Sequence, residues 1–172
     1  MTQFKLDKRE RQYLGTQLQK VSRSFALVIP TLEEPFNFYM ATAYLICRVV
    51  DNIEDCTQPF AWKEQRFQEF QQLAAEPTNA PSILARWSLE EWPGLTPDEV
   101  ETMGVAGGQP LWTIYARIPD RERASIRRWV SEMAIGMARF EAPQSPLHQA
   151  HERIRVLVAE ATYNEYCFYV AG

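Results

Sequence analysis

The chain has 172 residues, of which 46% are hydrophobic and 23% are charged, as is typical of one globular domain with a modest core. Its net charge of −4 argues against nucleic-acid binding, which requires a basic surface. Three scattered cysteines predict neither a disulfide scaffold nor a zinc site and suit a reducing cytosol. We find no signal peptide, and the longest uncharged run, 35–47, is too short to span a bilayer. We therefore expect a cytoplasmic, single-domain protein.

Helical periodicity runs through most of the chain, so we predict an all-α fold. In chain order, the predicted elements are helices over 8–21, 34–56, 61–75, 82–91, 97 onward, 120–140 and 145 or 147–159, a short apolar segment over 25–32, and a buried helix from 161. Thr96 should cap the helix that begins at Pro97. Glycines and Pro110 predict a break over 104–110. The last apolar run stops at Gly172 without a cap, which suggests an N-terminal fragment or an abrupt terminus.

The helix predicted over 34–56 ends in an acidic cluster formed by Asp51, Glu54 and Asp55. Pro59 stops this helix within a few residues, so the acids occupy its last turn. That turn is the negative end of the helix dipole, where cations are preferred. A sequence that violates a local preference in this way often serves a functional site.

One polar seam runs along the same helix. Residues three or four apart share a helix face, so Tyr44, Arg48, Asp51 and Asp55 form a line on an otherwise apolar helix, which predicts an internal cavity. The acids repel one another unless a cation joins them, and their oxygen ligands suit Mg²⁺ bound to a diphosphate. A solvated helix end, with Arg48 paired to an acid, is an equally open interpretation.

Two other segments bear on that choice. Ser22 and Arg23 precede Phe25 at a helix start, where a hydroxyl and a guanidinium can bind an anion, although a plain capping turn gives the same pattern. Tyr166 and Tyr169 lie three residues apart in the terminal apolar run. Such an aromatic stripe belongs to a core more often than to a site.

Together these strings resemble the squalene/phytoene synthase family of head-to-head prenyl transferases. The matching residues are 22–25, 44–48 leading into 51–55, 133–138 and 166–172, in the family's order. The Asp-x-x-Glu-Asp form of the acidic cluster is closer to the squalene synthase branch. The resemblance implies an isoprenoid-synthase-type helical bundle. This bundle is incomplete at the C-terminus, because the chain lacks the family's second aspartate-rich motif, and that absence puts the activity of these 172 residues alone in question.

The resemblance also implies a reaction, in which two farnesyl diphosphates condense to presqualene diphosphate and squalene with Mg²⁺ and, for the reductive step, NADPH. The implied roles are metal binding by Asp51, Glu54 and Asp55, diphosphate binding by Ser22, Arg23 and Arg48, a prenyl cavity lined by Phe25, Tyr169 and Val170, and catalysis by Tyr44 and Tyr166. Peripheral membrane contact for product release and a partner chain are further expectations. Two alternatives stay open: a non-catalytic helical module that binds prenyl diphosphate or pairs with a subunit, and phytoene synthase activity.

Overall fold

The computed structural model describes residues 4–143, 148–151, 154–157 and 159–171. Its helices are α1 (Lys8–Val21), α2 (Arg23–Val28), η1 (Ile29–Thr31), α3 (Phe36–Asp55), α4 (Phe60–Ala75), η2 (Pro77–Asn79), α5 (Ala80–Trp87), α6 (Pro97–Met103), α7 (Val105–Arg117), α8 (Asp120–Glu141) and α9 (Glu160–Ala171). An antiparallel hairpin of β1 (His148–His151) and β2 (Ile154–Leu157) lies between α8 and α9, with His148 paired to Leu157. The prediction of a helical bundle is confirmed.

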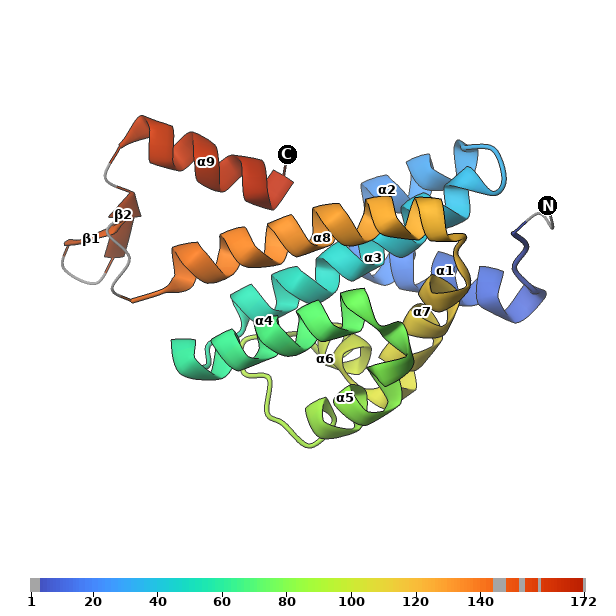
Figure 1. Cartoon of the computed structure of the whole chain (residues 1–172), viewed down its shortest axis with the longest axis horizontal. Helices are drawn as coiled ribbons and strands as arrows, with labels where there is room; N and C mark the ends of the chain where they lie inside the picture. Colours follow the sequence, from blue (N-terminus) through green and yellow to red (C-terminus); the bar gives the residue numbers. More distant parts are fainter. Residues whose placement is uncertain (1–3, 144–147, 152–153, 158, 172) are drawn as a thin grey trace.

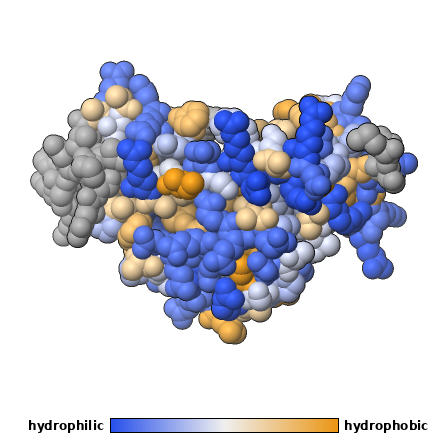
Figure 2. All heavy atoms as spheres, viewed as in Figure 1, coloured by the Kyte–Doolittle hydropathy of each residue, from blue (hydrophilic) through white to orange (hydrophobic). Residues whose placement is uncertain are grey.

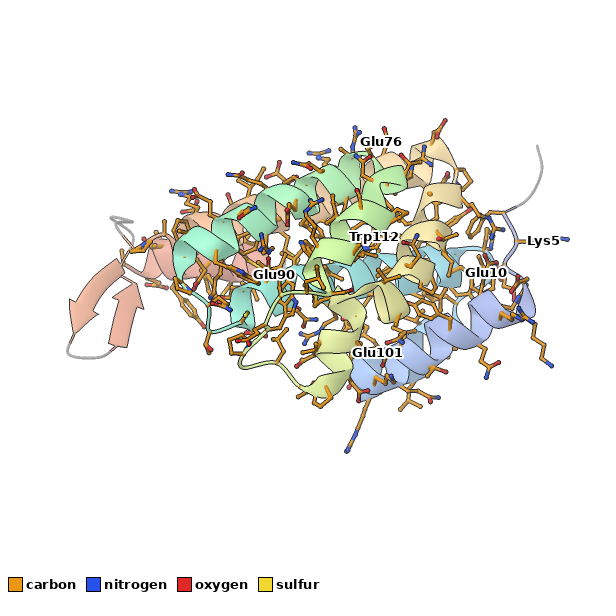
Figure 3. The ribbon with its side chains drawn as sticks, turned by 90° about the horizontal axis from the view of Figure 1, so that it is seen from below. Lys5, Glu10, Glu76, Glu90, Glu101 and Trp112 are labelled. Carbon is orange, nitrogen blue, oxygen red and sulfur yellow. The ribbon has the colours of Figure 1, made fainter. Side chains whose placement is uncertain are left out.

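Two long helices, α3 and α8, lie side by side along the long axis of the molecule (Figure 1). Helix α4 also packs on α8, α1 packs on α3, and α5 to α7 complete the other side of the core. α3 contributes Ile46, Val50 and Ile53, which are fully buried, and each such burial contributes about 1.5–3 kcal/mol. Trp112 of α7 lies in the middle of the helices (Figure 3). The apolar face of α3 therefore fixes how its polar seam is oriented.

The predicted start of α6 is confirmed in detail. Thr96 caps the helix, Pro97 is its first residue, and Glu99 completes a reciprocal capping box with the Thr96 backbone. Thr96 and Glu99 thereby satisfy N–H groups that would otherwise have no partner at this helix start.

The predicted break over 104–110 is confirmed at Gly104, which separates α6 from α7, and is wrong beyond it, because α7 runs from Val105 through Gly107, Gly108 and Pro110. Close packing of α7 on α6 explains the two glycines. A Cβ atom at Gly107 would lie 2.4 Å from the carbonyl oxygen of Glu101, and one at Gly108 would lie 2.6 Å from that of Thr102. The glycines therefore let two helix backbones approach and do not end a helix.

The helix predicted over 145 or 147–159 is also wrong in its described part, where the chain forms the β-hairpin. Ile154 and Val156 alternate with other residues at a period of two, which is a strand pattern that helical periodicity obscured. Residues 144–147, 152–153 and 158 of that prediction lie outside the described residues.

Helix α9 exists as predicted but is less buried than expected. It packs along α8 (Figure 1), and Tyr163 and Phe168 are still 55% and 53% exposed. Hydrophobic and hydrophilic residues are mixed over the face shown in Figure 2. Among the described helices, none combines the length and the apolar character needed to cross a bilayer.

Candidate functional site

The acidic cluster occupies the last turn of α3, as predicted. Asp51 and Glu54 are partly buried, whereas Asp55 is exposed. Helix α3 has no basic residue in that turn, but Lys63 of α4 supplies a cation from outside it. The Lys63 ammonium donates to the Glu54 carbonyl oxygen at 2.5 Å and to Glu141 Oε2 at 2.7 Å. The cluster is thus assembled from the ends of α3 and α8 and the start of α4.

Burial and repulsion raise the pKa of two acids in the cluster. The pKa of Glu54 rises to about 7, first because the carboxyl is desolvated and then because Glu141 and Asp55 repel its charge. The pKa of Asp51 rises to about 6, mainly by burial, although Arg48 opposes the rise. Several carboxylates therefore lie close together in a partly buried place, where a bound cation would relieve their mutual repulsion.

Arg48 is held between two helices. Its guanidinium donates to Asp51 Oδ2 at 2.8 Å within α3 and to Glu99 Oε1 at 3.1 Å on α6. Glu99 keeps its pKa low despite some burial, because Thr96 and Arg48 donate to its carboxylate. The expected pairing of Arg48 with an acid is therefore present, together with a second partner that the sequence did not suggest.

An apolar cavity of about 380 Å³ adjoins the seam. Its walls come from α2, α3, α8 and α9 and consist of Phe25, Tyr44, Cys47, Asp51, Trp129, Glu132, Met133, Phe168, Tyr169 and Val170. The rings of Phe25 and Tyr44 lie 4.5 Å apart between centroids. Asp51 links this cavity to the acidic cluster, so an apolar chain and an anion could bind side by side.

Close packing of α9 on α8 builds one wall of the cavity. Gly136 lies directly under Tyr169, and a Cβ atom there would be 2.1 Å from Cγ of the tyrosine ring. Phe140 packs against Tyr169 and, edge to face, against Tyr166. Any side chain at Gly136 would therefore displace α9 and reshape the cavity.

Tyr166 lies in the acidic cluster and is not part of the cavity wall. Its hydroxyl makes a long hydrogen bond, 3.4 Å, to Glu54 Oε1. The pKa of Tyr166 is raised to about 12 by burial and by the nearby Glu54, Glu141 and Asp55 charges. The phenol is consequently protonated at neutral pH and serves as a hydrogen-bond donor to Glu54.

The remaining predicted residues lie at the start of α2. Ser22 caps the helix, its hydroxyl oxygen accepting from the Phe25 backbone N–H at 3.2 Å. Arg23 is exposed, and the described residues give it no ion-pair partner. The structure therefore brings Phe25, Tyr44 and Asp51 together, whereas Ser22 and Arg23 belong to the capping turn beside them.

The donor types in the acidic cluster fit Mg²⁺. All are oxygens, and Asp51 and Glu54 are partly buried beside the third carboxylate, Asp55, so that their pKa values are raised by desolvation and by mutual repulsion. In the part of the chain that the structure describes, no three His, Cys, Asp or Glu side chains converge as a ligand set. Mg²⁺ needs only one or two carboxylates when water and phosphate oxygens complete its shell.

Several site residues were missed from the sequence although a signal existed. Cys47 is three residues from Tyr44 and four from Asp51, so it shares their helix face. Trp129 and Met133 are related by the same spacing on α8. By contrast, Lys63 and Glu141 meet the acidic cluster only through tertiary packing, which local spacing does not reveal.

Residues 18–172 match the family model described as squalene/phytoene synthase. A squalene synthase of Ganoderma lucidum is 28% identical over 157 residues, which are 90% of this chain and 30% of that protein. Two solved structures of TcSQS, with the ligands E5700 and BPH1237, superpose with TM-scores of 0.73 and 0.71 at 23% identity. Each comparison covers 95% of this chain and 41% of that one. The chain thus spans less than half the length of these relatives.

Proposed function

Since the chain belongs to the squalene/phytoene synthase family, we propose that it binds farnesyl diphosphate and serves the head-to-head condensation that leads through presqualene diphosphate to squalene. One observation carries this proposal: Asp51 lies where an acidic cluster meets an apolar, aromatic-lined cavity. A prenyl diphosphate has the matching parts, an apolar chain and a charged head that is bound through cations.

Asp51 and Glu54, with Asp55 beside them, would hold Mg²⁺. When bound, Mg²⁺ supplies neutralisation of the diphosphate charge, which makes the diphosphate a better leaving group. Arg48 is positioned next to Asp51 to donate to diphosphate oxygens. Ser22 and Arg23 stand at the α2 start, where a hydroxyl donor and an unpaired guanidinium suit the same anion.

The cavity residues would manage the carbocation that is left on the prenyl chain. Phe25 and Tyr44 offer aromatic faces, which attract cations in an apolar surrounding. Tyr169 and Val170 belong to an apolar wall that would keep water away from the cation once the prenyl chain fills the cavity. Tyr166 keeps its proton at neutral pH and, through its contact with Glu54, orients that carboxyl and can donate a proton at the diphosphate end.

The test is an Asp51→Asn substitution with Asp98→Asn as its matched control, since Asp98 is exposed on α6 and pairs with Lys20. We expect the wild-type chain and Asp98→Asn to bind farnesyl thiodiphosphate in a Mg²⁺-dependent manner, measured by calorimetry. Asp51→Asn should weaken that binding by about 10–100-fold. Undiminished binding in Asp51→Asn contradicts the proposed site.

A product assay distinguishes the branches of the family. Because the family's second aspartate-rich motif is absent from these 172 residues, the assay uses the chain joined to the C-terminal part of a squalene synthase. Given farnesyl diphosphate and Mg²⁺, this longer protein is expected to form presqualene diphosphate, and squalene once NADPH is added. Ligand binding without release of inorganic diphosphate would instead favour the non-catalytic binding module.

A further inference from the structure

The proposed function gives the acids at the end of α3 a role but does not explain how that helix terminus is held in place. Three acids crowd the negative end of the helix dipole, and the last turn of the helix contains no basic residue. Such a terminus should fray, since its last carbonyl groups lack partners and its side chains repel one another. A cation supplied by another element would remove both problems.

Lys63 supplies that cation. Its side chain is 8% exposed and comes from the first turn of α4, across the turn that follows α3. The ammonium donates to the Glu54 carbonyl oxygen at 2.5 Å, thereby capping α3, and to the Glu141 carboxylate at 2.7 Å, at the last residue of α8. It also lowers the pKa of Glu54, against the larger effects of burial and of Glu141. One ammonium thus joins three helices at the acidic cluster.

We propose that Lys63 is a positioning residue that clasps the ends of α3 and α8, with Glu141 as its anchor on α8, and so sets where Glu54 and Asp55 lie for cation binding. The clasp itself follows from the contacts, whereas its effect on Mg²⁺ rests on the proposed function. A buried ammonium with only a structural role would be replaceable, since a buried ion pair can often be exchanged for uncharged groups without loss of stability. That property provides the test.

Three variants separate positioning from stability. Lys63→Met removes the ammonium but leaves the Glu141 charge partly buried, so its melting temperature should fall. Adding Glu141→Gln removes that charge and keeps the shape of the side chain. The double variant should therefore regain most of the lost melting temperature. Lys20→Met is the matched control, because Lys20 also pairs with two carboxylates but does so at the surface between α1 and α6.

The first readout is amide hydrogen exchange of residues 54–56, including Cys56, whose N–H donates to the Asn52 carbonyl at 3.2 Å. In the double variant we expect these amides to exchange at least about tenfold faster than in wild type, although the melting temperature has recovered. Lys20→Met should exchange as wild type does. Wild-type protection of these amides in the double variant would overturn the proposal.

The second readout is a calorimetric titration with Mg²⁺ in the presence of farnesyl thiodiphosphate. Loss of the clasp should raise the half-saturating Mg²⁺ concentration of the double variant by about 10–100-fold. Recovery of both stability and Mg²⁺ affinity would reduce Lys63 to a structural ion pair and refute its positioning role. If wild type binds no Mg²⁺ while the double variant exchanges faster, the clasp stands and the proposed function fails.

Discussion

Helix α4 carries two buried cations three residues apart, Lys63 and Arg66, and they serve clusters of opposite character. The Arg66 cluster consists of Arg66, Glu69, Arg86 and Glu90, so two guanidinium groups meet two carboxylates. The Lys63 cluster consists of Lys63, Glu54, Asp55 and Glu141. Its ammonium contacts the Glu141 carboxylate and the Glu54 backbone carbonyl, and the Glu54 and Asp55 carboxylates lie nearby. Lys63 and Arg66 lie on the same helix face, but among the ion pairs of the described residues only the Arg66 cluster joins as many guanidinium groups as carboxylates.

The hydrogen bonds show the same contrast. Glu69 accepts from Trp87 Nε1 at 2.6 Å and from Arg86 at 3.0 Å, and Glu90, beside α4 in Figure 3, accepts from Arg66 and Trp62. In the Lys63 cluster, the pKa of Glu54 is raised to about 7 by burial and then by the nearby charges of Glu141 and Asp55. We infer that the Arg66 cluster, whose charges are paired, stabilises the fold. The acid-rich Lys63 cluster is better suited to bind a cation.

The largest expected effect comes from unbalancing the Arg66 cluster. Glu69→Ala leaves Arg66, which is 4% exposed, without its main buried partner, so the free energy of unfolding should fall by about 3–5 kcal/mol. Urea unfolding measures this change. Glu64→Ala, an exposed position on the same helix, should change the value by less than about 0.5 kcal/mol. If Glu69→Ala lowered the free energy of unfolding no more than Glu64→Ala does, the Arg66 cluster would not be a stabilising cluster.

A smaller effect is expected at the cavity wall. Gly136→Ala places a methyl group against Tyr169, and overpacking of this kind costs about 1–3 kcal/mol. Because α9 must shift, binding of farnesyl thiodiphosphate should weaken as well, which calorimetry measures. Gly15→Ala is the control, because position 15 is an exposed position of α1 and nothing lies within 4 Å of the added Cβ. This substitution should stabilise the chain by about 0.5–1 kcal/mol. Unchanged binding in Gly136→Ala would contradict the placement of α9.

The smallest effect sharpens the comparison through pH. The pKa of Glu54 rises from 4.5 to about 7 on folding, so the native chain retains a proton that the unfolded chain releases between these values. The stability associated with this proton is fully present below pH 4.5 and is lost as the pH rises to about 7. In the presence of EDTA, the stability advantage of Glu54→Gln over wild type should grow by about 1 kcal/mol between pH 5 and 8, a value kept small by solvent access. If urea unfolding gave the same difference in stability between Glu54→Gln and wild type at about pH 5 and at about pH 8, the raised pKa of Glu54 would be contradicted.

Local spacing predicted what one helix can determine. The seam of Tyr44, Arg48 and Asp51 follows from residues three and four apart, and the structure puts it beside a cavity. Spacing could not predict that Lys63 reaches the α3 terminus, because α4 and α8 approach it only in the folded chain. The glycines of α7 were misinterpreted for the same reason, since their role depends on contact with α6.

Glu99 illustrates how such contacts constrain the chain. One of its carboxylate oxygens accepts from Thr96 at the start of α6, and the other accepts from Arg48. An aspartate, shorter by one methylene group, would have to give up one of these partners. Positions 48, 96 and 99 should therefore covary among relatives, so that a substitution in an exposed turn is accompanied by a change beside the cavity.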